Sequence, residues 1–265
     1  RSTVQLPTLL QGRQAWAATA FCALPVVLGF FAPLLILLHL LWQEEVISFS
    51  ARYIGWLQNT IILGGVTALI AIAICVLMAY AARVTNSKLQ AICNRIVSMG
   101  YAIPGAVIAV GILIPLAYLD NWNAQHGVAL VLSGSVIALV YAYLVRFLAV
   151  SFQTVQAGLL KITPAMDASA RSLGHGLGAM LMRIHVPLLW RSVLTAGLLV
   201  FVDVVKELPA TLTIRPFNFD TLAVITHQLA SDERLGEAAL PALTIVMIAI
   251  VPVIILARAI AAGRR

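Results

Sequence analysis

The chain consists of long uncharged stretches separated by short segments that hold nearly all of its charges. A helix needs about 20 apolar residues to cross the hydrocarbon core of a bilayer. Five stretches without Asp, Glu, Lys or Arg reach that length, and they are residues 14–43, 53–82, 96–119, 121–145 and 238–257. Each of them predicts a membrane-spanning helix, so the expected fold class is an all-α, polytopic membrane protein.

A sixth span is predicted from about Leu188 to Leu212, although Asp203, Lys206 and Glu207 interrupt it. With six spans, both ends of the chain lie on one side, and that side carries 13 of the 17 Lys and Arg residues. Nine of the ten acidic residues then fall on or towards the other side. Because cationic loops are kept in the cytoplasm, both termini are predicted to be cytoplasmic.

The composition supports lipid as the solvent. Hydrophobic residues make up 62% of the chain, charged residues only 10%, and the mean hydropathy is +1.00, whereas about a quarter of a soluble domain is charged. The net charge of +7 is explained by cytoplasmic loops, without a nucleic-acid partner. The three cysteines form no Cys/His cluster that would predict a disulfide framework or a zinc site. The expected organisation is a cytoplasmic tail at 1–15, one transmembrane domain at 16–261 and a second tail at 262–265.

One long segment, from about Ser151 to Pro187, is predicted to stay outside the membrane on the cytoplasmic side. Thr163 suits the capping position of a short helix, and Pro164 suits its first turn. Gly174 suits the position just after the helix end. The helix would have one apolar face, formed by Met166, Ala170 and Leu173.

A second short helix is predicted in the same segment, with Met180 and Ile184 on one face and its end before Pro187. Two such helices lying parallel to the membrane would form a rigid knob, able to transmit force from a partner. The same pattern also fits an amphipathic loop that lies on the lipid surface, and the residues alone leave both interpretations open.

The segment resembles the coupling loop of ABC-importer permeases. Ala168-Ser-Ala-Arg-Ser-Leu-Gly174 is followed, after nine residues, by Ile184-His-Val-Pro187; the family motif reads Glu-Ala-Ala, three residues, Gly, nine residues, Ile, one residue, Leu-Pro. Ala168 stands in place of the Glu, Ser169 in place of the first Ala and Val186 in place of the Leu. The resemblance implies a coupling loop at about 158–187, with Asp167 as the candidate to supply the missing carboxylate. The residues implied to form the contact with an ATPase are Asp167, Ala168, Ala170, Arg171, Gly174, Ile184 and Pro187.

From about residue 50 onwards the chain resembles the ferric-iron permeases of that family, most clearly at Lys206-Glu-Leu-Pro-Ala-Thr-Leu212 and Arg215-Pro-Phe-Asn-Phe-Asp-Thr-Leu-Ala223. Those proteins usually carry two six-helix units, and this chain, which starts at Arg1 without a Met, resembles the second unit. The resemblance implies the MetI-like permease fold, location in the bacterial inner membrane, and import of ferric iron. The implied partners are an ABC ATPase subunit, a second permease unit and a periplasmic substrate-binding protein. Permeases for thiamine, sulfate or polyamines, and an ion-coupled secondary transporter, are the alternatives.

No phosphate-binding loop or hydrolase motif is present, so the chain is expected to be no enzyme, to bind no cofactor and to leave ATP to a partner subunit. Asp203, Lys206 and Glu207 share one helical neighbourhood and are the candidates for the translocation path. They could form an intrahelical ion pair at the outer interface, or their carboxylates could face the path. Ferric ion prefers oxygen ligands, which makes Glu207 a candidate metal ligand whose partners would come from the second unit. Arg146 is expected to extend its side chain back to the cytoplasm.

Overall fold

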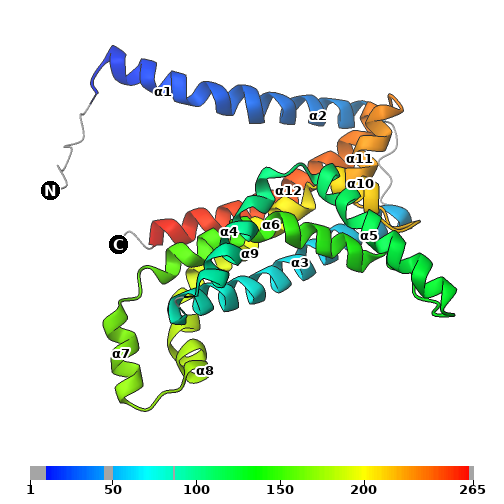
Figure 1. The fold of residues 1–265 in the computed structure, drawn as a ribbon. Helices are drawn as coiled ribbons and strands as arrows, with labels where there is room; N and C mark the ends of the chain where they lie inside the picture. The colour runs from blue at the N-terminus through cyan, green and yellow to red at the C-terminus, as the bar shows by residue number, and fades with distance from the viewer. Residues whose placement is uncertain (1–9, 45–49, 86, 263–265) are drawn as a thin grey trace.

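The computed structural model describes residues 10–44, 50–85 and 87–262, and every regular element in these ranges is a helix. Most helices run side by side in one bundle, while a long N-terminal rod stands apart from it (Figure 1). In chain order the elements are α1 (Arg13–Val26), η1 (Val27–Phe31), α2 (Ala32–Gln43), α3 (Ala51–Val84), α4 (Lys88–Met99), η2 (Gly100–Ala102), α5 (Gly105–Gln125), α6 (Val136–Leu159), α7 (Pro164–Ser172), α8 (Leu177–Met180), η3 (Leu181–His185), α9 (Val186–Val205), α10 (Pro209–Ile214), α11 (Leu222–Ser231) and α12 (Leu235–Ala262).

Within the described residues, six helical rods are long and apolar enough to cross a membrane. The first rod is α1, η1 and α2 end to end, and the fifth is α8, η3 and α9. The predictions of six spans and of an all-α fold are confirmed. The rods are Arg13–Gln43, Ala51–Val84, Gly105–Gln125, Val136–Leu159, Leu177–Val205 and Leu235–Arg258. Most of the two predicted tails, 1–15 and 262–265, lies outside the described residues.

The predicted bounds of the third span, 96–119, are wrong because charge was used as the boundary. The third span begins later, at Gly105, directly after Pro104, whose missing N–H suits the start of a helix. It also continues past Asp120, which lies inside α5. The carboxylate of Asp120 accepts hydrogen bonds from the backbone N–H groups of Leu132 (2.6 Å) and Ser133 (2.8 Å). Asp120 therefore folds the connection to α6 back onto the end of α5.

The bounds predicted for the fourth span, 121–145, are wrong for a related reason, although the span itself is present. The uncharged stretch ends at Arg146, but Arg146 lies in the middle of α6, which runs from Val136 to Leu159. Its guanidinium group pairs with a carboxylate of another helix, so a charged residue here does not mark the membrane edge. Counting uncharged residues cannot recognise a charge that is neutralised by a distant part of the chain.

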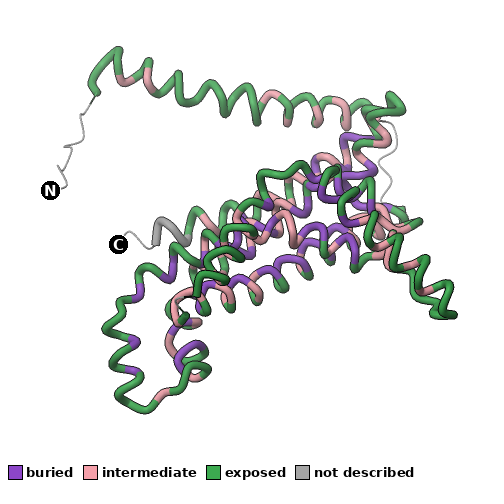
Figure 2. Tube along the Cα trace, viewed as in Figure 1, coloured by how far each residue is buried: buried purple, intermediate pink, exposed green. Residues whose placement is uncertain are grey.

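The core of the bundle lies where α3, α6 and α9 pack against one another, and Figure 2 shows the buried positions concentrated on these helices. Small side chains such as Ala71, Ala142 and Ala196 are fully covered there. In a bilayer, small residues let helix backbones approach closely, so packing replaces the hydrophobic driving force that water would supply. By contrast, the N-terminal rod contains no buried residue in α1, η1 or α2, and packs on the bundle through α2 against α12.

Candidate functional site

At one end of the bundle, α7, the following loop, α8 and η3 form a projecting unit, here called the knob (residues 160–185). Figure 1 shows α7 past the ends of α3 and α6 and across the direction of the spans. The predicted first helix is present, with Pro164 in its first turn. Gly174 has a φ of 78°, and two backbone bonds close the helix: Gly174 N–H to Arg171 C=O (2.9 Å) and His175 N–H to Ala170 C=O (3.1 Å). Thr163 precedes the helix, but its side chain makes no capping bond.

The second predicted helix does not end before Pro187. It starts at Leu177, widens through η3 and continues without interruption into α9, the fifth span. A proline inside a helix removes one hydrogen bond and collides with the carbonyl four residues earlier. The wider turn of η3, Leu181–His185, lies where that collision would occur and accommodates it. The knob is consequently in direct helical continuity with a membrane span.

A buried ionic cluster, here called the clamp, fixes α7 to the bundle. It consists of Arg83, Asp167 and His185. The Arg83 Nε lies 2.6 Å from Asp167 Oδ2, and the His185 Nε2 lies 3.0 Å from Asp167 Oδ1. The two other Arg83 nitrogens donate to the backbone carbonyls of Leu159 (3.0 Å) and Ile162 (2.7 Å). The clamp therefore ties the end of α3 to the end of α6, to α7 and to η3.

The clamp corrects the expectation for Asp167. Its carboxylate is buried and both of its oxygens are engaged within the chain, so it does not present a negative charge to a partner in place of the absent Glu. Ala168, at the Glu position of the motif, is exposed. The outer surface of the knob thus has no carboxylate at or next to this position.

Three residues of the clamp region, Arg83, His185 and Tyr80, are not among the candidate site residues predicted from the sequence. The side chain of His185 is fully buried. Tyr80 packs edge-on against it, with ring centres 5.1 Å apart, and donates its hydroxyl to the Leu177 carbonyl (2.8 Å). A usable signal existed, because Tyr80 and Arg83 close a long uncharged stretch and His185 lies inside the motif.

A shallow groove of about 410 Å³ lies beside α7 on the knob. Ala170 is buried in it, Ile184 is partly covered, and Met166 and Leu173 remain exposed. The predicted apolar face of α7 therefore contributes to an open surface; Leu173 is 78% exposed. The groove is lined by Ala165, Met166, Ser169, Ala170, Leu173, His175 and Ile184.

At the other end of α9 lies the charged break of the fifth span. The predicted span to Leu212 is too long, because α9 ends at Val205 and the separate short helix α10 follows. Asp203 and Lys206 form the expected intrahelical ion pair, with 2.9 Å between Oδ1 and Nζ. Glu207 is not part of that pair.

Glu207 instead pairs with Arg146 of α6, with 2.9 Å between Oε1 and Nη1. Its second oxygen, Oε2, accepts from the backbone N–H of Ala210 (3.1 Å) and from the Thr211 hydroxyl (3.3 Å), which satisfies the start of α10. The Glu207 side chain is only 2% exposed. The expectation that Arg146 reaches the cytoplasm is therefore wrong, because the guanidinium group neutralises a carboxylate inside the bundle.

The ion pair between Arg146 and Glu207 also constrains the residue at the start of α5. A Cβ on Gly105 would overlap Arg146 Nη1 and Glu207 Oε1, so any larger residue at this position requires the ion pair to shift. Four elements, α5, α6, α9 and α10, meet there. Among the described residues, no group of three or more His, Cys, Asp or Glu is placed to hold a metal ion.

The chain is similar in sequence to two transport permeases. No family model matches the chain. The chain is 25% identical over 94% of its length to the Fe(3+)-transport system permease protein FbpB 2 of Haemophilus influenzae, and spans 48% of the length of that relative. It is 28% identical over 73% of its length to the putative 2-aminoethylphosphonate transport system permease protein PhnV of Salmonella typhimurium, covering 69% of that protein.

Two solved structures share the fold. A bacterial ABC transporter involved in the import of alginate matches with a TM-score of 0.75, 16% identity and 95% coverage of both chains. The alginate ABC transporter in complex with an alginate pentasaccharide-bound periplasmic protein matches with a TM-score of 0.73, 17% identity and 92% coverage of both chains. The class is therefore that of multi-pass membrane proteins with the ABC-importer permease fold. Within that class, the chain is a homologue of ABC-importer inner-membrane permeases, including an iron(III) permease, as the coupling-loop resemblance predicted.

Proposed function

We propose that this chain is a transmembrane permease subunit of an ABC importer, which moves its substrate from the periplasm to the cytoplasm. The observation that carries the proposal is the knob: it has the residue spacing of the coupling loop, it projects from the bundle, and it is continuous with α9. A separate ATPase docks on the knob and hydrolyses ATP. A second permease unit completes the translocation path, and a periplasmic binding protein delivers the substrate.

The clamp gives this function a physical route. Movement of α7 by the ATPase is transmitted to α3 through Arg83 and to α9 through His185, because both side chains hold the carboxylate of Asp167. The ATP-bound and nucleotide-free ATPase contact the knob differently, and this difference in contact energy shifts the permease between its inward-open and outward-open states.

Ferric iron is the proposed substrate, supported by the match to an iron(III) permease along nearly the whole chain. The second candidate, a 2-aminoethylphosphonate, is supported by a match that covers a smaller part. The carboxylate of Glu207 is engaged by Arg146. At the break of the fifth span, Asp203 is therefore the candidate in this chain for a direct contact with iron, and its carboxylate is paired with Lys206. The two candidate substrates can be distinguished in cells that express the complete transporter. The measurement is the accumulation of radiolabelled iron(III) and of labelled 2-aminoethylphosphonate. ATP-dependent uptake of neither compound contradicts both assignments.

The proposed orientation places the knob in the cytoplasm. In a chain whose exposed Cys22 and Cys93 are replaced by serine, Ser169→Cys on α7 is expected to react with a membrane-impermeant thiol reagent only after the cells are opened. Val131→Cys, exposed in the connection between α5 and α6, is the matched position and is expected to react in intact cells. Labelling with the opposite pattern would overturn the orientation and, with it, the transport assignment.

Gly174 is expected to be needed for its backbone conformation. Its φ of 78° costs an alanine about 1–2 kcal/mol, whereas nothing lies within 4 Å of the added Cβ. Gly174→Ala should therefore loosen the end of α7 and lower the amount of ATPase that copurifies with the permease. Gly176→Ala is the control, because Gly176 has an ordinary φ of −71° and equal space. Equal ATPase retention by both variants would show that the shape of this turn does not matter for docking.

A further inference from the structure

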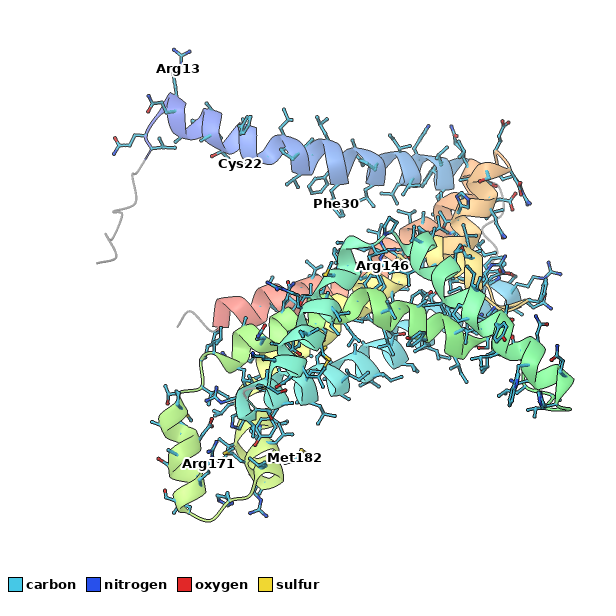
Figure 3. All side chains as sticks on the ribbon, viewed as in Figure 1. Arg13, Cys22, Phe30, Arg146, Arg171 and Met182 are labelled. Atoms are coloured by element: carbon cyan, nitrogen blue, oxygen red, sulfur yellow. The ribbon has the colours of Figure 1, made fainter. Side chains whose placement is uncertain are left out.

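The outer surface of the knob carries only positive charges. Lys161, Arg171 and Arg183 are exposed, and Asp167, which the clamp buries, is the sole acidic residue between positions 151 and 187. Figure 3 shows Arg171 beside α7 and Met182 at the α8 side of the same unit. A partner that covers this surface meets basic groups without any compensating carboxylate from this chain.

The same surface is also apolar. Leu173, Leu177 and Met182 are exposed, and the groove beside α7 has Ala170 and Ile184 in its lining. Exposed apolar groups that are rimmed by charged residues mark a surface that binds another macromolecule. The flexible side chain of Met182 can adapt to the shape of such a partner.

The occupant is a protein and not the membrane surface, because of how α7 is turned. Asp167 and Ala170 face the bundle and are buried. Within α7, Met166 is the only exposed residue that is bulky and apolar, whereas an interfacial helix inserts several such residues into lipid. The other positions that α7 exposes after Pro164 are small, polar or charged, and they are Ala165, Ala168, Ser169, Arg171 and Ser172. A smooth helix face of this kind allows the backbone of a protein partner to approach closely.

We propose that the knob docks into an acidic cleft of the ATPase subunit, in which Asp or Glu side chains lie opposite Arg171 and Arg183 and an apolar side chain enters the groove beside α7. This inference rests on the proposed function and adds the chemistry of the partner. In the coupling-loop motif an acidic residue of the permease stands at the position of Ala168; here the permease supplies the positive charges and the ATPase supplies the negative ones. Complementary charges of this kind select the partner and make docking sensitive to salt.

The test uses the permease, purified in detergent together with the ATP-binding subunit that accompanies it. Mass spectrometry identifies this subunit by peptides from its nucleotide-binding loop. The double variant R171E/R183E is expected to retain about tenfold less of this ATPase than the unchanged permease, since each reversal turns an attraction into a repulsion. Raising the salt from about 0.1 M to about 0.5 M is expected to release the ATPase from the unchanged permease. R258E, which reverses an exposed arginine near the end of α12, is the matched control and should retain the full amount.

R171Q/R183Q removes the charges without reversing them, and a retention between those of the unchanged and reversed chains supports the proposal even if R171E/R183E is poorly produced. Reversal of acidic residues in the ATPase cleft should restore binding to R171E/R183E. Equal retention by the reversed and unchanged permeases would overturn the acidic cleft while leaving the transport function in place. Absence of any ATPase from the unchanged permease would instead contradict the proposed function. If R171E/R183E loses only its binding to phosphatidylglycerol vesicles, the basic surface belongs to the membrane and the proposal is wrong.

Discussion

Replacement of Asp167 by asparagine is expected to abolish transport while leaving the chain inserted in the membrane. The carboxylate holds Arg83 at 2.6 Å and His185 at 3.0 Å, and all three groups are largely or fully buried. Removing one partner of a buried ion pair costs about 3–5 kcal/mol, because the other charge is left without compensation. We expect that α7 then separates from α3 and that ATP hydrolysis no longer drives uptake. The measurements are substrate uptake, and ATPase activity with and without substrate-loaded binding protein, at matched expression.

The control for Asp167 is Thr19→Ala in the N-terminal rod, away from the knob. Thr19 is exposed, and its hydroxyl bonds only the carbonyl of Ala15 (2.9 Å), one turn earlier, so this variant should transport normally. Normal uptake by Asp167→Asn would show that the clamp plays no part in coupling. If both the uptake and the amount of permease in the membrane fall, the variant has a folding defect. The ATPase activity of the fraction that still assembles then shows whether coupling is affected.

The second large effect is expected for Arg146→Met. Glu207 would keep a carboxylate that is only 2% exposed, so water has little access to replace the lost guanidinium group. The expected loss of stability is about 3–5 kcal/mol, visible as a lower thermal unfolding temperature in detergent and a smaller yield from membranes. The double variant Arg146→Met with Glu207→Gln should recover most of this loss, because neither charge then remains buried.

The control for this pair is Lys206→Met, one residue before Glu207. Lys206 pairs with Asp203, but its side chain is 60% exposed, and an exposed ion pair contributes at most about 1 kcal/mol. The thermal unfolding temperature should hardly change. If Arg146→Met and Lys206→Met had equal effects, the Arg146–Glu207 pair would not be the internal link between α6 and α10 that its geometry indicates.

The site was only partly predictable from the sequence. The position of α7 and its ends followed from Pro164, Gly174 and the spacing of apolar residues, since a proline at a helix start and a glycine with positive φ act within one turn. The wide turn before Pro187 was missed, although a proline there is a local signal. A break was predicted because prolines often end helices; the π-type widening of η3 lets the helix continue instead.

The sequence by itself determined the number of spans and the position of the helix α7, because span length and helix-end chemistry depend on neighbouring residues. Only the tertiary structure decided the partners of the charges: Arg83 meets Asp167 from 84 positions away, and Arg146 meets Glu207 from 61 positions away. The Arg146–Glu207 pair also explains why charge counting misplaced the fourth span, because Arg146 lies inside α6. The physical reason is that a buried charge is tolerated only with a partner, and the partner is chosen by the packing of distant helices, which local sequence patterns do not encode.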